Sequence, residues 1–144
     1  MSNIRLTVDE MSYISLFESI TGATAKDCII DETGNHIIFI VKQGEIGLAI
    51  GKNGNNIKRL RQYILKPIDI VEYSEKPKEF IKNSLSPARI RSIELVDRPD
   101  GKQIAKVEVD PEDRGISIGK NGKNIAKARI LAKRHFGIED VKIK

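Results

Sequence analysis

The chain has 144 residues, of which 40% are hydrophobic and 31% are charged, with one cysteine and a formal net charge of +5. This composition predicts a soluble globular protein, and a single cysteine excludes an internal disulfide and a cysteine-rich metal site. No apolar run approaches the roughly 20 residues that span a bilayer, and the N-terminus lacks a signal-peptide pattern, so we expect a cytoplasmic protein without membrane association.

The first half of the chain predicts a helix, two strands, two further helices and a third strand. Thr7 and Glu10 stand at the spacing of a capping box, and apolar residues recur after them at helical spacing. We therefore expect a helix from about Val8 to Ile20, ended by Gly22. The remaining elements are expected as strands at 27–31, 37–41 and 68–73, a turn at 32–35, and helices from 46 and over 55–65.

The second half predicts the same order of elements. Asp110 and Pro111 mark a helix start, because an Asp N-cap is followed by proline at the first helical position. We interpret Glu112 and Asp113 as partners of the helix dipole and not as a catalytic carboxylate pair. The other elements are expected as helices at 76–85 and from 123 to about 136, strands at 89–96, 104–109 and 139–143, and a turn at 98–101.

The strongest signal is a phrase of eight residues that occurs twice. Residues 50–57 read Ile-Gly-Lys-Asn-Gly-Asn-Asn-Ile, and residues 118–125, 68 positions later, are identical at seven of the eight positions. The apolar runs on both sides of each copy also correspond, and the period is too long for a solenoid repeat. We therefore expect two homologous domains, at 1–75 and 76–144.

The repeated turn Gly-Lys-Asn-Gly has the chemistry of an anion-binding site. Glycine permits positive φ and lets the main chain approach a ligand closely, and the start of the following helix carries a partial positive charge that suits a phosphate. The lysine adds a mobile cation, and the asparagine tolerates left-handed geometry. One copy would be explained equally well by an ordinary turn between helices, but two copies with the lysine kept favour anion binding.

Charge is divided unevenly between the halves. Residues 1–75 carry 8 Lys and Arg against 10 Asp and Glu, a net charge of −2, whereas residues 76–144 carry 17 against 10, a net charge of +7. A basic half is the usual footprint of a nucleic acid or another anionic surface.

Catalysis is not expected from this sequence. A phosphate-binding NTPase loop needs four residues between its glycines and Ser or Thr after the lysine. Here three residues separate Gly47 from Gly51, and Asn follows the lysine in both copies. His36 and His135 lie in different units without the spacing of metal ligands or of a nucleophile with its base. We expect a protein that is not an enzyme and has no cofactor and no metal.

The order of elements, with Gly-Lys-Asn-Gly between two helices, resembles a KH domain of the prokaryotic (type II) arrangement, in which a helix and a strand precede the core. Two such domains in tandem, with Asp-Pro-Glu-Asp-Arg-Gly at 110–115 leading into the second turn, are similar to the KH pair of the NusA transcription factors. Bacterial members also carry a polymerase-binding N-terminal domain and an S1 domain, so this chain resembles the short archaeal form. The resemblance implies an α+β fold in which each KH domain packs a three-stranded sheet against three helices.

The resemblance also implies a monomeric, non-catalytic protein that binds single-stranded RNA in transcription elongation or termination, with RNA polymerase as a further partner. KH domains clamp a short backbone segment with this loop. The expected RNA-binding residues are those of the two turns, their flanking isoleucines and the first turn of each following helix: Ile50, Gly51, Lys52, Asn53, Gly54, Asn55, Asn56, Ile57, Lys58, Ile118, Gly119, Lys120, Asn121, Gly122, Lys123, Asn124, Ile125 and Lys127. The isoleucines would anchor the helices and line a groove for the bases. On the last helix, Lys127 is expected on the face turned to solvent or a partner.

Two other functions stay open at this stage. The same fold could serve ribosomal RNA processing or ribosome assembly. Alternatively, the turns could have lost RNA binding and the chain could be a protein scaffold, an idea that the acidic first half supports. With 5% aromatic residues and no Trp, stacking platforms of the RRM or OB type are not expected.

Overall fold

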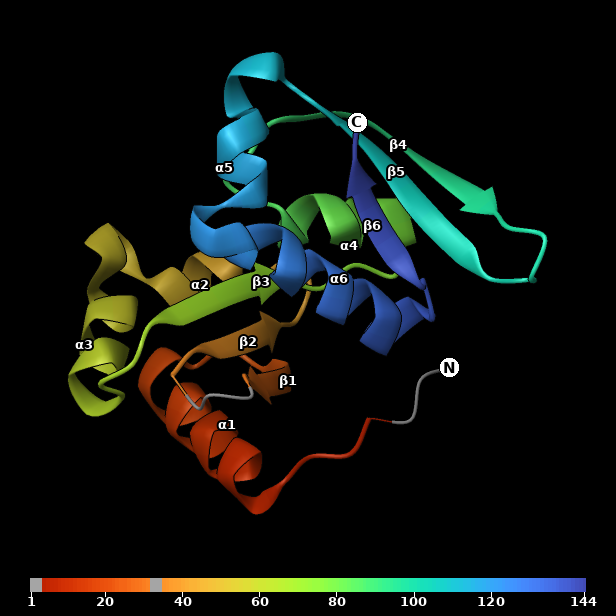
Figure 1. The fold of residues 1–144 in the computed structure, drawn as a ribbon. Helices are drawn as coiled ribbons and strands as arrows, with labels where there is room; N and C mark the ends of the chain where they lie inside the picture. The colour runs from red at the N-terminus through yellow and green to blue at the C-terminus, as the bar shows by residue number, and fades with distance from the viewer. Residues whose placement is uncertain (1–3, 32–34) are drawn as a thin grey trace. The chain divides into compact units, whose positions relative to one another are not determined.

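The computed structural model describes residues 4–31 and 35–144, which form two compact units, Ile4–Ser74 and Glu75–Lys144. Each unit combines a three-stranded mixed sheet with three α-helices (Figure 1), so the expected α+β fold is confirmed. Residues 32–34 of the expected turn lie outside the described residues. Among the described residues, none of the helices combines the length and the hydropathy that a membrane span needs.

The first unit follows the expected order of elements. Its elements are α1 (Val8–Thr21), β1 (Ala25–Ile30), β2 (Ile37–Val41), α2 (Ile46–Ile50), the 3₁₀ helix η1 (Lys52–Gly54), α3 (Asn55–Tyr63) and β3 (Ile68–Glu72). The capping box of α1 is confirmed, because the Thr7 hydroxyl accepts from the Glu10 amide while the Glu10 carboxylate accepts from the Thr7 amide. Gly22 ends α1 in the left-handed conformation. Helix α3 ends before the expected boundary, since Ile64 is extended and buried.

The second unit repeats this order with one additional 3₁₀ turn. Its elements are α4 (Pro77–Ser84), β4 (Ile90–Asp97), β5 (Gln103–Val109), the 3₁₀ helices η2 (Pro111–Asp113) and η3 (Lys120–Gly122), α5 (Arg114–Ile118), α6 (Lys123–Phe136) and β6 (Asp140–Ile143). Asp110 caps η2, with its carboxylate accepting from the Glu112 amide at 3.0 Å, and Pro111 is the first helical residue, as expected.

Both sheets have the same topology. The outer strand that comes first in sequence pairs antiparallel with the central strand, and the last strand pairs parallel with it, giving the orders β1-β2-β3 and β4-β5-β6. A parallel neighbour requires a long crossover. In each unit that crossover is the pair of helices on either side of a Gly-Lys-Asn-Gly turn, so the topology alone brings the turn to an end of the helical layer.

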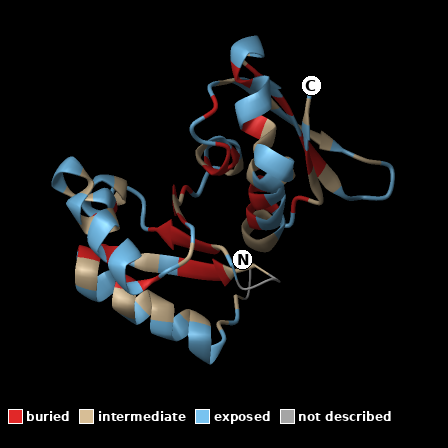
Figure 2. Ribbon diagram, turned by 60° about the vertical axis from the view of Figure 1, so that its left-hand side comes forward, coloured by how far each residue is buried: buried red, intermediate tan, exposed pale blue. Residues whose placement is uncertain are grey.

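Each unit has its own apolar core between its sheet and its helices. In the first unit, Phe17 stacks on Phe39 with ring centroids 4.5 Å apart, and Leu60 of α3 belongs to the same cluster. In the second, Leu85, Val107 and other aliphatic residues from α4, β5, α6 and β6 form the cluster. Buried residues lie on β1, β2 and β5 and on parts of the helices (Figure 2), whereas β4 has none. These cores hold the helices that carry the two turns.

Candidate nucleic-acid interface

The two turns have nearly the same backbone geometry. Gly51 and Gly119 have φ of 80° and 81°, and Asn53 and Asn121 have φ of 56° and 58°. These asparagines are the only residues other than glycine with positive φ in the described part of the chain. Among residues with a side chain, asparagine is one of the few that adopt this conformation readily. The two copies of the motif therefore share a backbone conformation as well as a sequence.

The first glycine of each turn is required twice over. Gly51 combines φ 80° with ψ 167°, a region that residues with a side chain essentially do not enter. A Cβ on Gly51 would also lie 2.7–2.9 Å from atoms of Asn56, including its main-chain nitrogen, and a Cβ on Gly119 would meet Asn124 at 2.8–2.9 Å. The second glycine, Gly54, is required only by its φ of 71°, since nothing lies closer than 3.8 Å to its Cβ position.

The turn residues between the glycines are open to solvent. Lys52 and Asn53 are exposed, as are Lys120 and Asn121. No side chain caps the start of η1 or η3. The first amides of a helix have no partner inside the helix, so the turns offer main-chain donors beside an exposed lysine. Both turns are therefore open to an approaching ligand.

Asn56 and Asn124, expected to extend the RNA surface, hold together segments on both sides of each turn. The side-chain amide of Asn56 donates to the carbonyl of Leu48 in α2 at 2.8 Å. The side-chain amide of Asn124 donates to the carbonyl of Leu85 at 3.0 Å, and it also lies within hydrogen-bond distance of two carbonyls of α5. These amide donors are occupied by main-chain acceptors, so the geometry indicates that both asparagines position the turn.

Aliphatic side chains are exposed next to both turns. Ile50 is 40% exposed and Leu48, which precedes it on α2, is 49% exposed; Ile116 on α5 is 48% exposed. Leu48 and Ile116 stand 68 residues apart and so occupy the same position in the two units. The sequence analysis did not include this pair, although the repeat itself would have singled it out. Exposed aliphatic groups beside an exposed turn could pack against the faces of nucleobases.

The structure places the other expected residues in three environments. The half-buried residues are Gly51, Gly54, Ile57, Ile118, Gly119 and Gly122. The exposed residues are Asn55, Lys58 and Lys123. Two placements are corrected. Lys127 is only 7% exposed, so it does not lie on a solvent face, and Ile125 is 5% exposed and belongs to the core, where it anchors α6 but does not line a groove. Helical spacing alone could not reveal that α6 is covered on more than one side.

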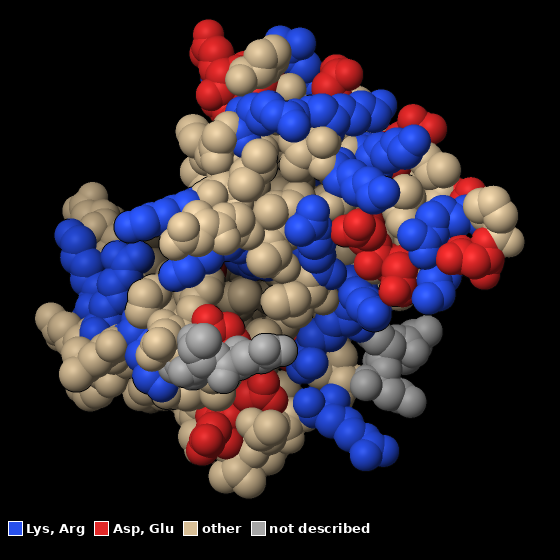
Figure 3. Space-filling view, viewed as in Figure 1, with Lys and Arg blue, Asp and Glu red and all other residues tan. Residues whose placement is uncertain are grey.

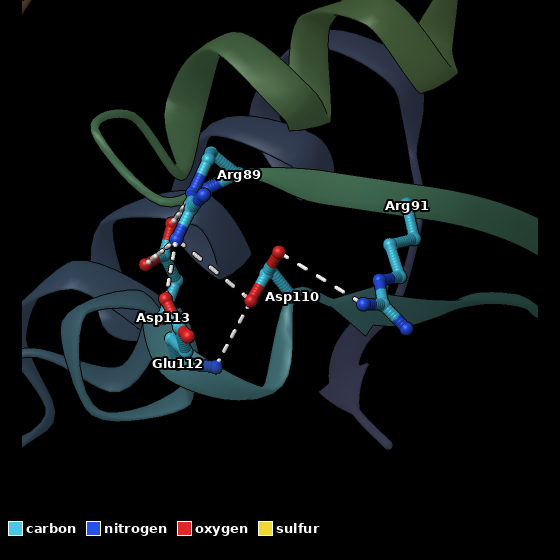
Figure 4. A network of polar contacts seen from close by, with 5 residues as sticks. All are labelled: Arg89, Arg91, Asp110, Glu112 and Asp113. Carbon is cyan, nitrogen blue, oxygen red and sulfur yellow. Dashed lines mark hydrogen bonds and ion pairs between the residues drawn. The ribbon is translucent and has the colours of Figure 1, made fainter.

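The acids before the second turn are held in an ion-pair network (Figure 4). Arg89 donates to the Asp113 carboxylate from its main-chain amide at 2.7 Å and from Nε at 2.9 Å, and its Nη2 also reaches Glu112 at 3.3 Å. The Arg89 hydrogen bonds lower the pKa of Asp113 below its ordinary value. Asp113 therefore stays ionised and anchors the start of α5. Glu112 forms an ion pair with Arg89, a contact beyond the expected interaction with the helix dipole.

The first unit contains a simpler form of the same anchor. Glu45, the residue before α2, accepts the main-chain amide of Thr24 at 2.7 Å, as Asp113 accepts that of Arg89. In both units the residue just before the first strand is thereby tied to the residue just before the helix that leads into the turn. This contact links the start of the sheet to the helix that ends at the turn.

Acidic residues are absent from both segments that surround the turns. Residues 46–68 contain five Lys and Arg and no Asp or Glu, and residues 114–138 contain seven and none. The first unit has a net negative charge, but all its acids lie outside the segment with the turn. Figure 3 shows Lys and Arg clustered over α3. This pattern is a signal in the sequence that dividing the chain into halves concealed, and it removes the support that the acidic half gave to a scaffold role.

The two histidines and the cysteine have structural surroundings. His36 Nε2 lies 2.7 Å from the Asp69 carboxylate, and the His135 ring packs edge-on against Phe80 with centroids 5.2 Å apart. Cys28 is buried. No cluster of three or more potential metal ligands occurs among residues 4–31 and 35–144.

Comparisons with known proteins agree with this geometry. Residues 12–75 match the model of the KH domain, and residues 77–144 match that of the NusA-like second KH domain. The chain is 34% identical to the probable transcription termination protein NusA of Methanocaldococcus jannaschii, over 99% of this chain and 76% of that protein. It is 39% identical to the protein of the same description from Methanococcus vannielii, over 97% and 79%. The chain is also similar to a solved structure, the crystal structure of APE1850. The sequence identity is 43% and the TM-score is 0.83, over 96% of this chain and 100% of that one.

Proposed function

The chain belongs to the NusA family, and on that premise we propose that it is a non-catalytic factor that binds single-stranded RNA during transcription termination or elongation. The proposal assigns one RNA-contacting KH domain to residues 1–75 and a second to residues 76–144. RNA polymerase is the further partner that this role requires.

The observation that carries the proposal is the pair of exposed turns, each within a segment free of acidic residues. In the first turn, Gly51 and Gly54 let the main chain approach a phosphodiester, and Gly119 and Gly122 do so in the second turn. Lys52 and Lys120 supply the cation, and the left-handed Asn53 and Asn121 hold the bend open. The exposed aliphatic side chains of α2 and α5 take the bases, which suits a strand whose bases are unpaired.

RNA binding by the turns is tested with a charge reversal matched to a control. We expect Lys52→Asp combined with Lys120→Asp to abolish binding to unstructured RNA. The control, Arg5→Asp combined with Lys78→Asp, makes the same change in net charge at exposed positions just before or in the first turn of a helix, where acids are tolerated. Binding is measured by fluorescence anisotropy and folding by circular dichroism. Equal losses of affinity in both double variants would leave only a non-specific charge effect.

The salt dependence of binding provides a second measurement on the unaltered protein. Contacts to phosphate release counterions, so log K should fall linearly with log salt concentration, by about 0.7 for each phosphate contacted on a single strand. Affinity that does not change with salt would rule out clamping of the backbone.

Co-purification separates termination from the alternative role in ribosomal RNA processing. Affinity-tagged protein isolated from cells should bring down RNA polymerase, with nascent transcripts attached. Recovery of ribosomal precursors without polymerase would favour the alternative.

A further inference from the structure

Helix α3 carries an exposed basic surface that leads away from the first turn. The turn ends at Gly54 and α3 begins at Asn55, so the two share one continuous backbone. Lys58, Arg59 and Arg61 are all exposed, and they form no ion pair with any described residue. Since Asp and Glu are absent from 46–68, this charge is not neutralised locally. An anion held by the turn would therefore remain near positive charge along the helix.

An aromatic side chain stands at the far end of this surface. Tyr63 is 66% exposed, and Leu65, just beyond the helix, is 87% exposed. Arg59 precedes Tyr63 by four residues, so the two lie on the same side of α3, one turn apart. With a rise of 1.5 Å per residue, Tyr63 lies about 12 Å from the start of the helix. Tyr63 is therefore about two helical turns from the bend, and a strand held at the turn must run along α3 to reach it.

The second unit has no exposed aromatic residue at the position equivalent to Tyr63. Core positions correspond at the repeat distance of 68 residues: Leu60 of α3 and Ile64, just after that helix, are buried, and so are Ala128 and Ala132 of α6. At the same distance Tyr63 corresponds to Leu131, which is fully buried.

The basic partner of the tyrosine differs between the units in the same way. Arg59 corresponds to Lys127, which is 7% exposed, whereas Arg59 itself is exposed. The combination of an exposed aromatic ring and an exposed cation is therefore specific to the first unit. A single exposed aromatic residue is ordinary in a folded protein, but here the ring lies along the basic helix that leads from the turn.

We propose that the C-terminal half of α3 extends the RNA-binding surface of the first unit, with Tyr63 stacking on a base and Arg59 contacting the neighbouring phosphate. The inference rests on the proposed function, because the turn must deliver the strand to α3. An aromatic ring can stack on any base. A ring next to a cation is the usual arrangement for binding single strands without strong sequence preference. The first unit would then contact more nucleotides than the second.

The test compares the binding of short and of long RNA to variants of the full chain. Lys120→Asp with Asn121→Asp silences the second turn, so that binding reports on the first. Unstructured RNA of four nucleotides and of about twelve nucleotides is titrated against Tyr63→Ala, Tyr63→Phe and Arg59→Ala in that background. Met11→Ala, at an exposed apolar position of α1, is the control for loss of exposed side-chain surface.

We expect Tyr63→Ala to weaken binding of the long RNA at least about 5-fold, the lower limit for loss of one base-stacking contact, and to leave the short RNA unaffected. Tyr63→Phe keeps the ring and should bind like the parent, and Arg59→Ala should lower the salt slope for the long RNA only. Unchanged affinity of Tyr63→Ala for the long RNA would overturn the inference and leave this surface to a protein partner. An equal loss for both lengths would also overturn it, because the effect would then lie at the turn. Failure of Lys52→Asp to weaken the short RNA would instead refute the proposed function.

Discussion

The first glycine of each turn should be far less replaceable than the second. Gly51→Ala places a side chain at φ 80° and ψ 167°, which costs about 1–3 kcal/mol in backbone strain. Its Cβ would lie 2.8 Å from the main-chain nitrogen of Asn56, which cannot move without displacing α3, and overpacking of this kind costs about 1–3 kcal/mol more. Gly54→Ala would make only ordinary van der Waals contacts, the nearest at 3.8 Å, and incurs only the cost of the left-handed conformation, about 1–2 kcal/mol.

We therefore expect Gly51→Ala to lower the free energy of unfolding of the first unit by about 2–6 kcal/mol, and Gly54→Ala by about 1–2 kcal/mol. A domain of this size has a total stability of only several kcal/mol, so the first variant should be close to unfolding. Urea titration followed by circular dichroism measures both. The pair Gly119→Ala and Gly122→Ala repeats the comparison in the second unit, where a Cβ at Gly119 meets the main-chain nitrogen of Asn124 at 2.9 Å. Equal destabilisation by the two glycine variants of a turn would refute this reasoning.

Three further predictions concern contacts that support the turns and the helices. Asn124→Asp should destabilise the protein by about 1–3 kcal/mol in urea titration, because a carboxylate replaces a donor that faces main-chain carbonyls; a loss no larger than that of the control named next would contradict this anchoring role. Asn55→Asp makes the same chemical change at an exposed position of the first unit and serves as the control for stability. Because Arg89 lowers the pKa of Asp113, the ion pair stabilises the fold above the unfolded-state pKa of about 3.9 and is lost as pH falls through the lower folded-state value. The stability of the parent should therefore fall more steeply below about pH 4 than that of Arg89→Gln, and parallel curves would contradict this role. Finally, Thr7→Ala removes the capping box of α1 and should cost about 1 kcal/mol in the same titration, whereas Thr7→Ser should cost little.

Most of the architecture could be predicted because the local signals agree with the fold. The capping box at Thr7, the Asp110-Pro111 start, the apolar run of β2 and the alternating apolar residues of β5 each identify an element at the observed place. The end of α3 was less predictable. No residue within 55–65 breaks the helix, and it ends at Tyr63 because the next residue, Ile64, is buried in an extended conformation.

The candidate site was predictable as a motif but not in the roles of its parts. Lys52 and Asn53 lie exposed in the bend, as the motif indicates. Asn56 looks like a surface residue in the sequence, and only the structure shows its amide donating to the Leu48 carbonyl. Arg89 gave no signal at all, because its acidic partners stand more than twenty residues later in the chain.

The sequence by itself determined the duplication, the two Gly-bounded bends and the segregation of charge around them, since each depends only on residue type and order along the chain. Tertiary structure decided which side chains of the flanking helices reach solvent. Lys127 and Arg59 occupy equivalent positions of a repeated motif, yet the first is buried and the second exposed. Burial depends on what packs against a helix, and that is set by segments remote in the sequence, whereas the bend depends on its own φ and ψ.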